Sequence, residues 1–84
     1  MGDPTDVFAT KLVRREFNKH LVNVTMADIR VAHGTVFIRG VVHAQRGAHY
    51  HDVEEEVKRI VRILRQRPEI RDVVLDCTYK NLLH

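Results

Sequence analysis

The first quarter of the chain carries apolar residues with the period of an α-helix. The stripe recurs every four positions, with one further residue at its edge, and consists of Ala9, Leu12, Val13, Phe17 and Leu21. Lysines and arginines occupy the other faces, as expected when a helix buries one stripe against a core. Thr5 or Asp6 can accept the first free helical N–H groups. The pattern therefore predicts an amphipathic helix that starts at one of these two residues.

The apolar period changes to two after residue 26, which is typical of strands with one buried face. The alternating positions are, in chain order, Ile29, Val31, Val36, Ile38, Gly40 and Val42. Gly34 interrupts the alternation where the chain must reverse, and a residue without Cβ adopts a positive φ at little cost. We therefore predict a β-hairpin with a positive φ at Gly34.

A second amphipathic helix is predicted after a connection marked by Gly47. Asp52 can cap the start of this helix, and Pro68 cannot continue it. Its apolar stripe consists of Val53, Val57, Ile60, Val61 and Leu64. A last strand follows, in which Val73, Leu75, Cys77 and Tyr79 alternate with mostly polar residues. The sequence thus predicts one more helix and one more strand after the hairpin.

The predicted order of elements is helix, strand, strand, helix, strand, which is an α+β fold. The hairpin strands pair antiparallel, and a right-handed crossover through the second helix makes the last strand parallel to its neighbour. We expect a two-layer α-β-β-α-β domain over residues 6–79, with a three-stranded mixed sheet and two helices on one face. Residues 1–5 and 80–84 are expected to be flexible or loosely packed, and Leu82 and Leu83 either pack back on the domain or serve a partner.

Two segments of the sequence resemble a known family. The hairpin has the spacing Ile29-x-Val31-x-x-Gly34-x-Val36-x-Ile38-x-Gly40-x-Val42, and Pro68-Glu69-Ile70-x-x-Val73 follows the second helix. This pattern resembles the signature of the BON domain family, bacterial modules found in OsmY-like and nodulation-related proteins, over roughly residues 6–79. The chain departs from that family at Glu69, where glycine is usual, so the turn into the last strand must be built differently. The resemblance implies a non-catalytic module that binds phospholipid surfaces or mediates protein contacts.

The composition is that of one small folded domain. The 84 residues are 44% hydrophobic and 30% charged, which is unlike a disordered chain. Cys77 is the only cysteine, so neither a disulfide within the chain nor a thiolate metal cluster can form. No apolar run has the length of a signal peptide or a membrane span. As given, the chain is expected to be cytoplasmic, or periplasmic if a leader peptide has been removed.

Residues with catalytic or metal-binding chemistry are present but do not form a recognisable motif. Among the six histidines, His49 and His51 are closely spaced and His43 is nearby, as in some zinc or nickel sites. They lie in a predicted loop, where solvated side chains with at most adventitious metal binding explain them better. Cys77 is in phase with the apolar residues of the last strand, which favours a buried thiol over a nucleophile. We expect no enzyme activity, no cofactor and no metal ion.

One face of the predicted sheet is left without helices, and we expect this face to bind a protein partner or a second copy of the chain. Its candidate residues are Phe37, Arg39, Val41 and Val74. The net charge of +3 permits an alternative, association with anionic phospholipid surfaces. The candidate contacts for this alternative are Lys58, Arg62, Arg65 and Arg46. Weak RNA or DNA binding is a third interpretation, although the sequence has neither the Gly-x-x-Gly loop of KH domains nor the aromatic platform of RRM domains.

Overall fold

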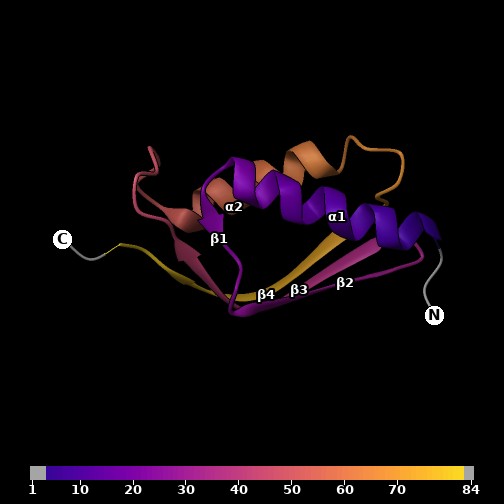
Figure 1. Cartoon of the computed structure of the whole chain (residues 1–84), viewed down its shortest axis with the longest axis horizontal. Helices are drawn as coiled ribbons and strands as arrows, with labels where there is room; N and C mark the ends of the chain where they lie inside the picture. Colours follow the sequence, from indigo (N-terminus) through magenta and orange to yellow (C-terminus); the bar gives the residue numbers. More distant parts are fainter. Residues whose placement is uncertain (1–3, 83–84) are drawn as a thin grey trace.

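The computed structural model describes residues 4–82 as two helices packed on a curved sheet (Figure 1). The elements are, in chain order, helix α1 (Pro4–Lys19), strands β1 (Val22–Asn23), β2 (Ala27–Ala32) and β3 (Thr35–Ala44), helix α2 (Val53–Leu64) and strand β4 (Asp72–Lys80). Figure 1 shows both helices on the same side of the sheet. The predicted α+β class is confirmed. Neither helix in the described part of the chain has the length and apolar character needed to cross a membrane.

Strand β3 is the centre of the sheet and pairs along both of its edges. On one edge, β2 pairs antiparallel with the first part of β3 and β1 pairs antiparallel with its end. On the other edge, β4 runs parallel to β3 from Thr35↔Asp72 to His43↔Lys80. The sheet therefore has four strands, where the sequence analysis predicts three. The additional strand was missed because Val22 and Asn23 are too few residues to show a period of two.

Gly40 allows the chain between β1 and β2 to pass close to β3. It has a φ of +116°, and a Cβ built at this position would lie 2.7 Å from the backbone oxygen of Met26. The same oxygen accepts a hydrogen bond from the N–H of Val41 at 3.2 Å. Only glycine combines this φ with so close an approach of another backbone segment. The glycine spacing of the hairpin thus has a local physical cause at this position.

The two-residue turn between β2 and β3 is anchored by α1. His33 and Gly34 have φ values of +51° and +83°, as in the type I′ turns that favour tight hairpins. The predicted positive φ at Gly34 is confirmed. The buried Asp6 carboxylate accepts the N–H groups of His33 at 3.0 Å and Gly34 at 3.1 Å. Asp6 therefore binds the hairpin turn and not the first N–H groups of the helix, and α1 begins at Pro4, one residue before Thr5.

The apolar stripes of both helices meet the sheet in one core. Its fully buried residues, with no more than 2% of their surface exposed, include Val13, Phe17, Val22, Val36, Ile38, Val42, Val53, Val57, Ile60 and Leu64. All five predicted stripe residues of α2 are buried. Leu12 on α1 is only partly buried, and so is Leu21, which was predicted to continue this stripe but lies beyond the end of the helix at Lys19. The core is thus built largely from the positions that the periodicity indicates.

Two side chains cap the start of α2, and one of them comes from the end of the chain. The Asp52 carboxylate accepts the N–H of Glu54 at 3.1 Å, as predicted. The Asn81 side chain accepts the N–H of Val53 at 2.7 Å. Asn81 therefore has a defined contact although residues 80–84 were expected to be loose. Leu82 is 41% exposed, and Leu83 lies outside the described residues.

The connection between α2 and β4 is built without a glycine. The N–H of Ile70 donates to the carbonyl of Arg67 at 3.1 Å, and the N–H of Arg71 donates to the carbonyl of Gly34 at 2.8 Å. Ile70 is buried, while Glu69 does not have a positive φ. Because no left-handed residue is needed here, the departure from the BON pattern at Glu69 is compatible with the turn.

Candidate functional site

The sheet face opposite the helices carries the four predicted interaction residues, and we call these residues the open face. Phe37 and Val74 are neighbours across β3 and β4, with 40% and 42% of their surface exposed. Arg39 is exposed and Val41 is half-buried. Positions 37, 39 and 41 alternate with buried core residues along β3, so the strand pleat places them on the same side of the sheet. The structure therefore brings the predicted residues together on one surface.

Charged residues of both signs surround the apolar pair on this side of the sheet. Arg39 stands in register between Asp28 of β2 and Asp76 of β4. Its Nε atom lies 3.5 Å from Oδ2 of Asp76, and the Nε of Arg30 donates to Oδ2 of Asp28 at 2.9 Å. Such exposed pairs contribute little to stability. Their effect is to leave the surroundings of the open face nearly neutral.

The predicted basic residues of α2 line a groove between this helix and β4, and we call it the α2–β4 groove. Its lining residues are Lys58, Val61, Arg62, Arg65, Val73 and Leu75. The three cations follow from helical spacing, but the apolar floor depends on how α2 packs against β4. Arg46 lies in the connection between β3 and α2 and does not line the groove. The structure thus brings three of the four predicted anionic-surface contacts together.

Two of the three cations already have carboxylate partners. The Nζ of Lys58 lies 3.8 Å from Glu54, and Nη2 of Arg65 lies 3.0 Å from Asp72. Arg62 forms no ion pair with any residue between 4 and 82. The positive charge available to a ligand is therefore greatest at Arg62.

The histidines singled out in the sequence do not converge on one point. His49 and His51 line a pocket of about 220 Å³ near Tyr50 and Leu82. His43 is absent from its lining, and the Nε2 atom of His43 is buried without a hydrogen-bond partner. Between residues 4 and 82, no three side chains of the metal-ligating types gather closely enough to hold an ion.

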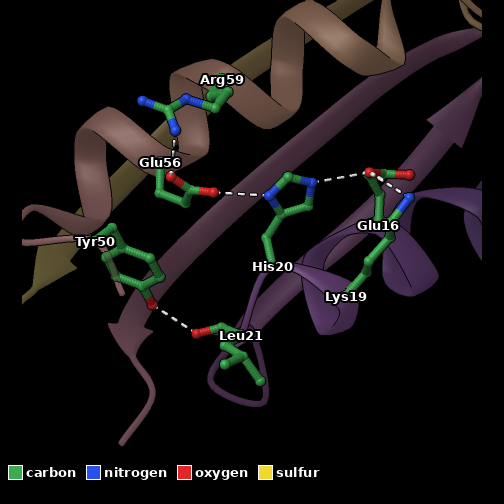
Figure 2. Close-up of polar contacts among 7 residues, drawn as sticks. All are labelled: Glu16, Lys19, His20, Leu21, Tyr50, Glu56 and Arg59. Atoms are coloured by element: carbon green, nitrogen blue, oxygen red, sulfur yellow. Dashed lines mark hydrogen bonds and ion pairs between the residues drawn. The ribbon is translucent and has the colours of Figure 1, made fainter. Parts of the chain in front are cut away.

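Sequence reasoning missed a charged cluster that joins the two helices (Figure 2). His20 lies between two carboxylates, with Nδ1 at 2.7 Å from Glu56 and Nε2 at 3.0 Å from Glu16. Lys19 approaches Glu16 at 4.0 Å, and Arg59 approaches Glu56 at 3.5 Å. A neutral imidazole has one N–H, so only the imidazolium form donates to both carboxylates. The spacing of Glu16 and His20 was visible in the sequence, whereas the contact with buried Glu56 was not.

Comparisons of the chain with protein-family models, curated proteins and solved structures find no match. No relative or structural neighbour therefore assigns a role to any residue of the candidate site.

A second link beside the charged cluster fixes the end of α1. The hydroxyl of Tyr50 donates to the carbonyl of Leu21 at 2.6 Å (Figure 2) and accepts the N–H of Gln45 at 3.2 Å. Leu21 has a φ of +58°, a left-handed conformation that is common where a helix ends but costly for a residue with a branched side chain. Burial raises the pKa of Tyr50. These contacts tie the end of α1 to the connection between β3 and α2.

Cys77 has the surroundings of an unreactive thiol. It is half-buried on β4, and its Sγ–H donates to the carbonyl of Ile38 at 3.3 Å. Burial raises the pKa of the Cys77 thiol, which lowers the fraction of thiolate, the form that acts as nucleophile. Burial also raises the pKa of Tyr79 to about 12. The arrangement is suited to packing and not to nucleophilic chemistry.

Proposed function

We propose that this protein is a non-catalytic interaction module, similar to a BON domain, that assembles with a second copy of itself through the open face. The observation that carries the proposal is the exposed apolar pair formed by Phe37 and Val74 on the sheet face without helices. Exposed apolar surface on a folded domain is a common mark of a protein contact. Aromatic residues such as Phe37 also provide large contact areas at protein interfaces.

The charges around the open face favour a second copy as the partner. A contact between identical faces must be self-complementary, because each residue meets the symmetry-related surface. Arg39 is flanked in register by Asp28 and Asp76, so a symmetric contact can pair the arginine of one copy with a carboxylate of the other. A face dominated by one sign of charge would repel its own copy.

The absence of a catalytic role is supported by the chemistry of the side chains. The pKa shifts of Tyr50, Cys77 and Tyr79 are all upward and all arise first from burial. Upward shifts favour the protonated forms, which are poor nucleophiles and poor bases. None of these residues is paired with a group that would activate it.

The second candidate function is association with an anionic surface, either phospholipid or nucleic acid. It is favoured by the position of Lys58, Arg62 and Arg65 in one groove. The ion pairs of Lys58 with Glu54 and of Arg65 with Asp72 reduce the charge that an extended anionic surface would meet. Self-assembly through the open face is therefore the stronger proposal.

The mass of the protein in solution tests self-assembly. The natural chain is expected to shift from monomer to dimer as its concentration rises in sedimentation equilibrium. Val74→Glu should abolish the dimer because it places a charge in the contact. Val7→Glu is the matched control, since Val7 is 50% exposed on α1, on the other side of the sheet. A natural chain that stays monomeric at about 1 mM, or a Val74→Glu variant that dimerises like the control, contradicts the proposal.

A further inference from the structure

Side chains cover the backbone groups along the first part of the outer edge of β4, while the backbone groups farther along this edge are uncovered. Within residues 4–82, β4 pairs with β3 only, so its other edge has no neighbouring strand. At the start of this edge, the N–H of Val73 donates to the Asp72 side chain at 2.8 Å, and Arg65 Nη2 reaches the Val73 carbonyl at 3.5 Å. The backbone groups of Val73 are therefore directed away from β3 and covered by side chains.

The alternation of a strand determines which backbone groups lie farther along this edge. Residues two apart direct their N–H and C=O groups to the same side, so Leu75, Cys77 and Tyr79 follow Val73. No side chain between residues 4 and 82 accepts their N–H groups. This leaves an open stretch of about 13 Å, at about 3.3 Å per residue. Such a stretch can accept another strand.

The α2–β4 groove lies beside this open edge. Val61 and Val73 are buried at its floor, and Leu75 is half-buried. An added strand would direct every second side chain toward α2, over Leu75. The groove therefore offers an apolar surface together with unpaired backbone groups.

The cations on α2 have a spacing that suits acidic side chains on an added strand. Lys58 and Arg62 are four residues apart, or about 6 Å along a helix that rises about 1.5 Å per residue. Side chains on the same face of a strand are about 6.6 Å apart. Arg62, which has no ion pair among the described residues, adds charge beside the open backbone groups. An extended segment with an acidic residue at every second position matches this arrangement.

We propose that the α2–β4 groove binds an extended acidic segment of a partner protein, which adds as a strand to the outer edge of β4. This goes beyond self-assembly because it uses a different surface. A peptide satisfies both requirements of the site, since its backbone pairs with β4 and its carboxylates meet Arg62. Phospholipid and nucleic acid meet only the second requirement. The edge of β2 is a poorer acceptor because β2 has six residues against nine in β4.

Amide hydrogen exchange measured by NMR tests the added strand directly. The probe is a blocked synthetic peptide of alternating glutamate and valine, and its control has lysine in place of each glutamate. The glutamate peptide is expected to slow exchange at Leu75, Cys77 and Tyr79 by at least about ten-fold. The amides of Val74 and Asp76, which face β3, should change little. Binding without protection at the three edge amides, or equal binding of the lysine peptide, overturns the proposal.

A pair of charge reversals tests the role of the groove. Arg62→Glu is expected to weaken binding of the glutamate peptide by about ten-fold or more. Arg15→Glu makes the same change in net charge on an exposed residue of α1 and should change affinity by less than about two-fold. Circular dichroism checks that both variants fold. Equal losses in the two variants would show a general charge effect and overturn the proposal, as would absence of peptide binding to the natural chain.

Two other anionic probes separate the peptide from the alternatives. Phosphatidylserine vesicles and a single-stranded oligonucleotide are each added to the natural chain and to the Arg62→Glu variant. The proposal expects neither to protect the edge amides of Leu75 or Cys77. Protection of these amides by either probe, at least as strong as that given by the peptide, overturns it. Self-association is measured separately by mass, so failure of peptide binding and failure of the open-face dimer are distinguishable.

Discussion

Removal of the Asp6 carboxylate should weaken the whole fold, because this group joins α1 to the hairpin. The carboxylate accepts N–H bonds from His33 at 3.0 Å and Gly34 at 3.1 Å, and Asp6 is only 9% exposed. Hydrogen bonds to charged groups contribute about 1.5–3 kcal/mol each. One donor is only partly buried, so we expect Asp6→Ala to lower the free energy of unfolding by about 2–4 kcal/mol. For a domain of this size the melting temperature should fall by about 10–25 °C.

Urea denaturation followed by circular dichroism measures this loss. Asp6→Asn keeps one acceptor oxygen and should show an intermediate effect. Asp28→Ala is the control, since its carboxylate is exposed and paired with Arg30, and it should cost less than about 1 kcal/mol. Equal effects of Asp6→Ala and Asp28→Ala would refute the reasoning. If Asp6→Ala speeds amide exchange in the first turn of α1 but leaves exchange at Gly34 unchanged, Asp6 acts as a helix cap after all.

Three further predictions concern other parts of the fold. Gly40→Ala should lower the free energy of unfolding, measured in urea, by about 2–4 kcal/mol, because a Cβ at Gly40 meets a backbone oxygen at 2.7 Å. Gly47→Ala is the control and should cost less, since a Cβ at Gly47 meets nothing within 4 Å. Equal losses in the two variants would contradict this. The pKa of Tyr79 is raised to about 12 from 10.0, mainly by burial, so its contribution to stability is complete below pH 10 and is lost as the pH rises through 12. Phenolate absorbance should show a titration step near 12 that Tyr79→Phe removes. His20→Ala should lower stability by about 1–3 kcal/mol in thermal unfolding because buried Glu56 loses a partner, and the loss should shrink when Glu56→Gln is added.

The parts of the fold that the sequence predicts are those with a local signal. The stripe of α2 repeats over three turns, and all five of its residues are buried. The hairpin is marked by alternation on both sides of Gly34, whose φ is positive. A helix or strand buries one of its faces whichever element of the fold covers that face, so the period of the apolar residues is enough to predict these elements.

The parts that the sequence does not predict depend on contacts between distant residues. Strand β1 exists because Val22 and Asn23 meet the far end of β3. Asp6 is a good helix cap by type, yet it binds a turn 27 residues away. Glu56 belongs to a run of glutamates at a helix start, and nothing in that run distinguishes the one that meets His20. Which of several chemically similar residues makes such a contact depends on tertiary packing, and the local sequence does not show it.

The candidate surfaces also combine features that the sequence predicts with features that it does not. Side chains alternate between the two faces along a strand, so the sequence could group Phe37 with Val41 on the open face. The three cations of α2 follow from helical spacing. The ion pair of Arg65 with Asp72 and the floor at Leu75 do not, because both depend on where β4 lies against α2. Sequence therefore predicts which side chains share a face more easily than how much charge that face offers.

The two proposed surfaces meet on β4 and use alternate residues of the strand. Val74 faces the open side of the sheet, whereas Val73 and Leu75 line the groove, and the strand pleat places the two sets on opposite faces. A substitution at Val74 therefore removes a side chain from one surface while the backbone groups of the other stay in place. A segment added to the edge would also place its own outward side chains beside Val74 and widen the open face. If both proposals hold, binding of the acidic segment and self-assembly are coupled, and each changes the apparent affinity of the other by the same factor.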